Sequence, residues 1–456
     1  MKFLFFSPHG DSAGIAHRVQ EEGNDVWLYI VDQNAKATLE GIVPQVQSVA
    51  AGLAKNPDVV FFDMVGYGDI AVRMQKLGFK VIGSGALFKG EHVQDKIELD
   101  RAFGSDVMKS GGILTPETIE FKGSEIQKAI KFIREKNKPY VTKPNDNKTP
   151  FTTYVPDSVD DNIEHLQRAE DEGQIRTNEK FILQEMVDGI EISTEMWFTK
   201  GKPIYPANGT METKKFLVGN LGPNTGCSTS LVWFYEKKQP KIVQLTLKKI
   251  FTFMEICQYT GPIDLNAIVS KKDHKPYGLE WTARPGYSAI YALIRLLDLK
   301  HYDLAQHLHL IATGELAEFY IRDGFGYSLR VSVPPYPLCI EDDKTREKLF
   351  KETGGQKVKF TGDEESFFPL DVRQNEKGEM ETAGVDGVVG EVTGRGDTIE
   401  NAKNEAHAQF KKLSVPHKQA RLDGWKRPMK EIPILESWGY EMPKIGGTNG
   451  QLPSVA

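Results

Sequence analysis

The stretch GPIDLNAIVSKKDHKPYGLEWTARPG, residues 261–286, sets the fold that this chain is predicted to adopt. It contains two strand-like runs that would pair across residues 270–276. Because side chains on a strand alternate between its two faces, each run presents its polar groups to one side. Pairing would bring five of these groups to one cleft: Asp264, Asn266, Glu280, Thr282 and Arg284. The alternative interpretation is a hairpin with an ordinary solvated face.

The chemistry of this set favours a site for a metal ion and a phosphate. Carboxylate and amide oxygens suit Mg²⁺, which normally keeps substrate phosphate oxygens among its ligands. The guanidinium of Arg284 would be placed to bind a phosphate or a carboxylate through two parallel hydrogen bonds.

A second unusual stretch, NLGPNTGCSTS at residues 220–230, precedes the strand pair by about forty residues. Gly222, Pro223 and Gly226 predict a turn, in which Asn224 and Thr225 would bond to their own backbone. One interpretation is a tight surface loop before a hairpin. The other is one wall of the phosphate-bearing site.

Composition limits the class of protein. The 456 residues suggest about three domains, and a net charge of −6 disfavours bulk attraction to nucleic acid or to an anionic membrane. The three cysteines are widely spaced, which argues against a disulfide framework or a thiolate zinc site and for a reducing compartment. The first residues read as a strand, and no apolar run approaches the roughly 20 residues that cross a bilayer. We therefore expect a cytoplasmic protein.

The order of strand and helix signals predicts an α/β and α+β multidomain chain. Strands alternate with helices up to residue 93, which is typical of a parallel, doubly wound, Rossmann-like unit. The expected units are 1–93, 94–315 with a small lobe at about 115–187, an α+β unit at 316–430, and a surface tail at 431–456.

The middle unit carries several local predictions. Isoleucine spacing predicts a helix at 124–138, followed by a strand at 139–146 that contains Lys143. Two further strands are expected on either side of a hairpin turn at Asp188–Gly189. A lone lysine such as Lys96 is a weak signal, and a strand lysine is more often a rim residue.

The order of these features along the chain is more specific than any one of them. Several features occur in the order that an ATP-grasp ligase shows. They are Lys96, the strand lysine Lys143, the acidic residues Glu185 and Glu191, the GPNTG motif, and the E-x-T-x-R motif at 280–284. More narrowly, the chain resembles the phosphoribosylamine–glycine ligase family, also called glycinamide ribonucleotide synthetase. That family carries GPNTGG, E-F-N-x-R-F-G-D and E-E-x-x-x-G-E-E elements, which stand here as GPNTGC, EWTARPGY and QEMVDGIE. GEVTGRGDTIENAKNEAHAQF and RLDGW (421–425) also resemble its last domain, so the resemblance covers roughly residues 1–430.

The resemblance implies that two ATP-grasp lobes clamp ATP, whose γ-phosphate passes to a carboxylate to give an acylphosphate that an amine attacks. The expected ATP-binding residues are Lys96 and Lys143 at the phosphates or adenine, the backbone of Glu185, Met186 and Val187 at the adenine edge, and Glu191 at the ribose. The expected ligands of Mg²⁺ (or Mn²⁺) are Glu280 with Asn266 or Asp264. The residues expected near the substrates are Arg284, Lys214, Lys215 and Asn224.

The chain departs from the family pattern in three places. Thr282 replaces a metal-binding asparagine, SPHGDSAG replaces the N-terminal G-N-G-G-R-E-H loop, and GYSAI replaces an acidic G-D-P-E segment. The nucleotide machinery is therefore expected to be kept and the substrate pocket to be rebuilt.

These departures leave several functions open. The chain could make glycinamide ribonucleotide, join an amino acid to another acceptor such as a modified nucleotide or DNA base, or be an ATP-binding module without ligase activity. A dehydrogenase is the weakest alternative, since no GxGxxG follows the first strand. The expected partners are a small-molecule carboxylate and an amine, with no membrane, nucleic acid disfavoured but not excluded, and a monomer or small homo-oligomer.

Overall fold

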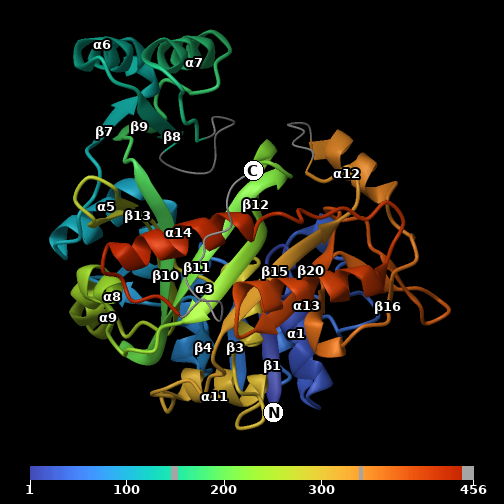
Figure 1. The fold of residues 1–456 in the computed structure, drawn as a ribbon. Coiled ribbons are helices and arrows are strands. Elements are labelled where there is room, and N and C mark those ends of the chain that lie inside the picture. Colours follow the sequence, from blue (N-terminus) through green and yellow to red (C-terminus); the bar gives the residue numbers. More distant parts are fainter. Residues whose placement is uncertain (145–152, 338–342, 444–456) are drawn as a thin grey trace.

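The structure is a computed structural model that describes residues 1–144, 153–337 and 343–443. A parallel sheet lies at the N-terminal end, a small antiparallel sheet stands off from the body, and a large antiparallel sheet runs through the centre (Figure 1). This arrangement confirms the predicted α/β and α+β fold class. No helix in the described ranges is long and apolar enough to cross a membrane.

The N-terminal sheet follows the prediction of a parallel unit. Its strands, in spatial order, are β2 (Asp25–Ile30), β1 (Lys2–Ser7), β3 (Val59–Phe62) and β4 (Val81–Ile82), and every neighbouring pair is parallel. The helices that alternate with them are α1 (Ala13–Glu21), α2 (Val49–Leu53) and α3 (Gly68–Lys76). Residues 3–6 and 59–62 are fully buried, as expected for parallel strands covered on both faces.

The small lobe consists of the antiparallel strands β7 (Thr118–Lys122), β9 (Lys180–Glu185) and β8 (Tyr140–Pro144), in that spatial order. Its helices are α6 (Ile126–Lys136) and α7 (Val159–Asp171), which lie side by side over the sheet (Figure 1). Ile130 and Ile133 of α6 are buried against Leu166 and Phe181 in a core of their own. The helix predicted at 124–138 is present as α6, and residues 140–144 of the strand predicted at 139–146 form β8; residues 145 and 146 lie outside the described residues.

The large sheet has eight strands in the order β14-β13-β10-β11-β12-β15-β20-β17. Their bounds are β10 (Gly189–Thr199), β11 (Lys202–Leu217), β12 (Leu221–Phe234), β13 (Gly261–Ser270), β14 (Pro276–Thr282), β15 (Phe325–Ser332), β17 (Phe367–Pro369) and β20 (Val388–Gly396). β13 and β14 form the antiparallel pair predicted for residues 261–286. The sheet is continuous across residue 315, since β12 pairs with β15.

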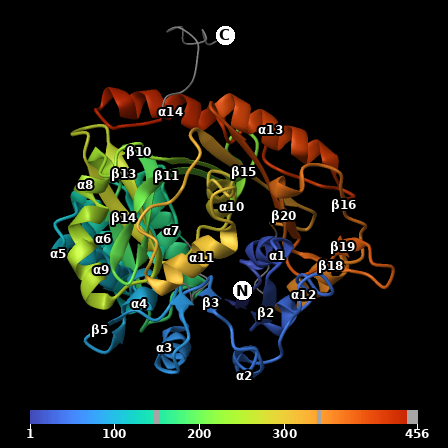
Figure 2. The same ribbon diagram turned by 90° about the horizontal axis from the view of Figure 1, so that it is seen from below.

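Helices connect and cover these sheets. α4 (Val93–Leu99) and α5 (Arg101–Ser110) link the N-terminal sheet to the small lobe and pack on β14. α13 (Ile399–Lys412) and α14 (Lys426–Ser437) follow one another along one side of the molecule, opposite the N-terminal sheet (Figure 2). The remaining helices are α8 (Lys241–Leu245), α9 (Phe251–Cys257), α10 (Ala289–Ile294), α11 (Leu304–Thr313) and α12 (Asp343–Lys351). Three short two-stranded antiparallel sheets complete the described strands: β5 (Leu87–Phe88) with β6 (Glu91–His92), β16 (Lys359–Phe360) with β21 (Leu413–Ser414), and β18 (Val372–Gln374) with β19 (Met380–Thr382).

The prediction of a turn at residues 222–226 is wrong. These residues belong to β12, in which Asn224 lies opposite Lys215 and Leu221 opposite Leu217. The chain reverses instead at Val218–Asn220, where Gly219 and Asn220 have positive φ angles. Pairing with β11 therefore overrides the local preference of glycine, proline and asparagine for a turn.

Two other local predictions also fail. β9 and β10 do not form a hairpin at Asp188–Gly189, because β9 belongs to the small sheet and β10 to the large one. Residues 431–437, expected in a surface tail, are the second half of α14, with Ile432 and Leu435 fully buried. Residues 444–456 of the expected tail lie outside the described residues.

Candidate functional site

One face of the large sheet is polar across successive strands. Residues directly opposite each other in antiparallel strands share a face, as do alternate residues along one strand. The pairings Glu280–Asn266, Asn266–Ser193, Asp264–Glu195, Glu212–Ser230, Ser230–Ser328 and Arg330–Glu391 therefore lie on a single face. The opposite face is apolar, and it buries Ile192, Leu265, Leu231 and Leu329 in one cluster with residues of α13 and α14.

Glu280 lies at the centre of a group of cations on the polar face. Nη1 of Arg101, the first residue of α5, donates to Glu280 Oε2 at 2.7 Å. Burial opposes ionisation of Glu280, but Arg101, Lys143 and Lys214 outweigh it and lower its pKa to about 2. Glu280 is therefore ionised throughout the physiological range.

Lys143 brings the small lobe into the same group. It stands on β8 with 8% of its surface exposed. Burial lowers its pKa to about 8; the charge of Glu280 partly offsets this effect, whereas the like charges of Arg101 and Lys214 add to it. Glu280 on the large sheet and Lys143 on the small one thus act on each other, so the group spans the space between the two lobes.

Glu191 of β10 occupies the next position on the face. Its Oε1 accepts from Lys214 Nζ at 3.1 Å and from Asn266 Nδ2 at 2.8 Å. Burial opposes ionisation of Glu191, but Lys214 and the Asn266 amide outweigh it and hold its pKa below the usual value. Lys214 therefore joins Glu191 to the cations around Glu280.

Asn266 and Glu280 together fit a divalent cation. They are direct cross-strand neighbours, and Asn266 is 7% exposed. Its amide nitrogen is held by Glu191, whereas its buried Oδ1 has no hydrogen-bond partner. A free amide oxygen beside a carboxylate that stays ionised is the donor chemistry that Mg²⁺ prefers.

Asp264 has a different environment from Glu280. It lies opposite Thr282 and Glu195 rather than opposite Glu280. Burial and the like charges of Glu195 and Glu212 raise its pKa well above the usual value. A carboxyl that keeps its proton is a poor metal ligand, so the geometry favours Asn266 as the companion of Glu280. Among the described residues, no group of three or more His, Cys, Asp or Glu side chains is arranged to hold a metal ion.

The structure separates two of the predicted lysines from this group. Lys96 on α4 pairs with Glu91 at 3.0 Å and lies over the Phe103 ring at 4.8 Å. The backbone carbonyl of Lys215 accepts a hydrogen bond from Arg421 Nη1 at 2.7 Å. Its neighbour Lys214 is the residue whose Nζ donates to Glu191. Arg101, which was not predicted, and Lys214, one of the two lysines expected near the substrates, are thus the cations that join Glu280 and Glu191.

The segment predicted to meet an adenine edge is the connection between the two lobes. It leaves β9 at Glu185, which pairs with Lys138 at 2.8 Å, and enters the large sheet at Gly189. Met186 is 41% exposed, and Val187 is half-buried. Met186 and Val187 therefore lie in a partly exposed connection between β9 and β10, the strand that carries Glu191.

Arg284 follows β14 and is rigidly held. Glu98 accepts from Arg284 Nε at 3.0 Å and from the Ala283 backbone N–H at 2.7 Å. The guanidinium also lies 4.1 Å from the centre of the Tyr287 ring. Nη1 of Arg284 also donates to the Pro285 carbonyl at 3.3 Å, so the guanidinium is held on several sides.

Sequence reasoning missed the arginines that come from distant segments. Arg427 of α14 donates from Nη1 to the Glu212 carbonyl at 3.0 Å and from Nη2 to the Glu191 carbonyl at 2.7 Å. It therefore ties together β10 and β11 at the point where Glu191 and Lys214 meet. No local pattern marks Arg101 or Arg427, because their partners lie 179 and more than 200 residues away.

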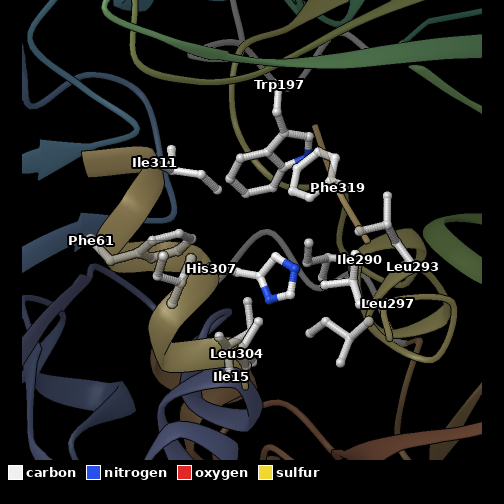
Figure 3. A pocket seen from close by; sticks show the side chains of 12 residues that line it. Ile15, Phe61, Trp197, Ile290, Leu293, Leu297, Leu304, His307, Ile311 and Phe319 are labelled. Carbon is white, nitrogen blue, oxygen red and sulfur yellow. The ribbon is translucent and has the colours of Figure 1, made fainter. Parts of the chain in front are cut away.

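A small internal cavity of about 20 Å³ lies apart from this face, between α10–α11 and the N-terminal sheet. Figure 3 shows His307 pointing into it among Trp197, Phe319 and aliphatic side chains. Burial lowers the pKa of His307, and its Nε2 has no hydrogen-bond partner. With a single polar group and room for about one water, this cavity is a feature of the core and not a reaction site.

The geometry described above is that of an ATP-grasp protein, in which a small and a large sheet face each other across a charged group. Residues 99–288 match the family model described as the phosphoribosylglycinamide synthetase, ATP-grasp (A) domain. The phosphoribosylamine–glycine ligase of Clostridium acetobutylicum is 22% identical over 246 residues, which cover 52% of this chain and 55% of that protein. The match thus spans about half the length of this relative.

Solved structures extend the likeness in fold to nearly the whole chain. The crystal structure of phosphoribosylamine–glycine ligase from Thermotoga maritima has a TM-score of 0.67 at 19% identity and covers 93% of this chain and 100% of that one. Biotin carboxylase from Campylobacter jejuni, solved as a β-γ-ATP complex, has a TM-score of 0.60 at 12% identity, covering 96% and 97%. The chain therefore contains an ATP-grasp domain, and that domain resembles the one of phosphoribosylamine–glycine ligases.

Proposed function

We propose that the chain is an ATP-dependent carboxylate–amine ligase. The carboxylate of one substrate attacks the γ-phosphorus of ATP, and ADP leaves. The nitrogen of a neutral amine then attacks the carbonyl carbon of the acylphosphate, an amide C–N bond forms as the C–O bond to phosphate breaks, and the nitrogen gives up one proton. The residue types of the site match this demand, because such a reaction needs positioning and charge neutralisation more than covalent help from the protein.

The observation that supports this proposal best is the group formed by Lys143 and Glu280. One comes from the small lobe and the other from the large sheet, yet each shifts the pKa of the other. A nucleotide lying between the lobes would meet Lys143, Arg101 and Lys214 with its phosphates. These cations are already arranged around a carboxylate, so little reorganisation is needed when a triphosphate binds.

The metal belongs to the proposal as well. Glu280 and the free Oδ1 of Asn266 would hold Mg²⁺ or Mn²⁺. Bound there, the ion would neutralise charge on the phosphate oxygens. Arg284, fixed by Glu98 and Tyr287, would orient the carboxylate substrate or the phosphoryl group in transfer. Glu191, with the backbone of 185–187, would bind the nucleoside.

The test follows oxygen from the carboxylate. Purified protein is incubated with ATP, Mg²⁺, glycine labelled with ¹⁸O in its carboxylate, and phosphoribosylamine generated in the assay. Inorganic phosphate carrying ¹⁸O is expected, since the acylphosphate takes one carboxylate oxygen into the phosphate. Other amino acids and amines replace these two substrates in parallel assays.

Two variants make the test specific to the site. Glu280→Gln should lower turnover by about 10³-fold, because a metal-bridged charge typically contributes several kcal/mol. Glu91→Gln removes a similar carboxylate that pairs with Lys96 away from the site, and it should leave turnover unchanged. If the parent binds ATP but no substrate pair transfers ¹⁸O, the chain is a nucleotide-binding module and not a ligase.

A further inference from the structure

A cleft of about 420 Å³ opens where the N-terminal unit, β12 and the C-terminal unit meet. Its walls include His9 and Asp32 from the N-terminal unit, Asn224 and Gly226 from β12, and Asp386 from the turn before β20. This volume is within the usual range for small-molecule sites. The cleft lies apart from the metal and nucleotide residues around Glu280.

The cleft is connected to the proposed reaction centre through Gly226 and Tyr287. A Cβ placed on Gly226 would lie 3.3 Å from the Tyr287 ring, and that ring covers the Arg284 guanidinium at 4.1 Å. Asp11, in the loop after β1, interacts electrostatically with Arg284 and with Arg330 of β15. The cleft wall at Gly226 therefore lies against the ring that covers the Arg284 guanidinium.

The balance of charge around the cleft is negative. The arginines that act on Asp11 and Asp386 each already have a carboxylate of their own: Arg284 pairs with Glu98, and Arg330 Nε donates to Glu391 at 2.8 Å. Asp11 and Asp386 are two further carboxyl groups that these pairs do not include. Burial, together with the charge of Asp11, raises the pKa of Asp386 to about 6, although Arg330 acts in the opposite direction.

Cations at the outer end of the cleft are also engaged. His9 lies 3.4 Å from Asp32, and Lys351 pairs with Glu347 of the same helix. Among the described residues that line the cleft, His9 and Lys351 are the only basic side chains. Both basic side chains among the described lining residues are thus already paired with a carboxylate, and neither is available to bind a phosphate.

The N-terminus of α1, where a doubly wound unit could bind a phosphate, is also occupied. The backbone N–H of Ser12, at the start of α1, donates to Asp63 Oδ2 at 2.7 Å. Asp63 is 3% exposed, and Tyr291 and Phe368 lie against Gly14 in the first turn. An internal carboxylate therefore occupies the place where an anion would bind a helix N-terminus.

We propose that this cleft binds the amine acceptor of the reaction, and that the acceptor is a cationic amine without a phosphate group. The proposal rests on the ligase function proposed above. Asp386 and Asp11 would hold the ammonium group, and the polar walls at Asn224 and Asp32 would hold the remainder of the acceptor. A phosphate monoester would bring two further negative charges into a cleft whose cations are already paired, which costs binding free energy.

The test compares two amines that differ by one phosphate. Binding of glucosamine and of glucosamine 6-phosphate to the full chain, saturated with Mg²⁺ and a non-hydrolysable ATP analogue, is measured by calorimetry. Glucosamine is expected to bind at least about tenfold more tightly. Tighter or equal binding of the phosphorylated amine, or no binding of either one, would overturn the proposal.

Charge variants locate the effect in the cleft. Asp386→Asn should weaken glucosamine binding by about tenfold, and it should reduce the difference in affinity between glucosamine and glucosamine 6-phosphate. Asp32→Asn is a second, independent variant at the outer wall and should act in the same direction. Asp188→Asn removes the same charge from an exposed site with 85% of its side chain accessible, outside the cleft, and should change neither affinity. An equal effect of Asp188→Asn would also overturn the proposal.

The result separates the two proposals. A chain that fails to bind the ATP analogue contradicts the ligase function itself. A chain that binds the analogue and transfers ¹⁸O from a carboxylate, but prefers the phosphorylated amine, contradicts only the acceptor class.

Discussion

The ion pair between Glu391 and Arg330 gives the sharpest prediction about the site's framework. Glu391 on β20 has no exposed surface and accepts from Arg330 Nε at 2.8 Å and from the hydroxyls of Ser288 and Ser328, each at 2.6 Å. Glu391→Leu would leave a buried guanidinium and two buried hydroxyls without their acceptor. Loss of one partner of a buried pair costs about 3–5 kcal/mol, and each neutral hydrogen bond adds about 1 kcal/mol.

The expected loss of about 5–7 kcal/mol is a large part of the stability of an ordinary domain, which is about 5–15 kcal/mol. Arg330→Met should cost about 3 kcal/mol, because the carboxylate keeps its two serine donors. The double variant should be more stable than Glu391→Leu alone, since it removes both charges. The coupling energy must then exceed the cost of Arg330→Met alone, which is about 3 kcal/mol.

The assay is urea unfolding of the four proteins of this cycle at neutral pH, monitored by circular dichroism. Their free energies of unfolding are compared with one shared slope against urea concentration. Glu379→Gln serves as the control, because its pair with Lys357 is largely exposed and is expected to change stability by less than about 0.5 kcal/mol. The reasoning is refuted if Glu391→Leu costs less than about 1 kcal/mol, or if the double variant is no more stable than Glu391→Leu.

Two further predictions concern α14 and the N-terminal loop. Arg427→Lys should raise the KM for ATP while the fold is retained, because a single ammonium cannot bridge the Glu191 and Glu212 carbonyls as the guanidinium does; an unchanged KM would contradict this positioning role. Burial and the charge of Asp11 raise the pKa of Asp63 to about 7 from an ordinary 3.8. Since the unfolded chain ionises this group at lower pH, its contribution to stability falls as pH rises between these values, and Asp63→Asn should gain stability relative to the parent from pH 4 to pH 8. Urea titrations at several pH values measure this gain, and a constant difference between the two proteins would contradict it.

The local patterns in the sequence were most informative where structure is set by neighbours in the chain. Alternation along residues 261–286 predicted both the strand pair and the shared face of Asn266 and Glu280, because alternation is a property of the strand itself. The helix of the small lobe, found at Ile126–Lys136, followed from isoleucine spacing in the same way. The order of motifs then led to an ATP-grasp domain, which the family match at residues 99–288 supports.

Tertiary pairing decided the rest. Residues 222–226 have the composition of a turn, yet β11 supplies hydrogen-bond partners that keep them in a strand. The strands on either side of Asp188–Gly189 joined different sheets, since alternation identifies a strand without identifying its neighbour. The same holds for charge: Arg101 meets Glu280 across 179 residues of chain. Strand alternation is thus enough to tell which side chains share a face, whereas the pairing of cations with carboxylates follows from the folded chain, because those contacts join segments that no local interaction brings together.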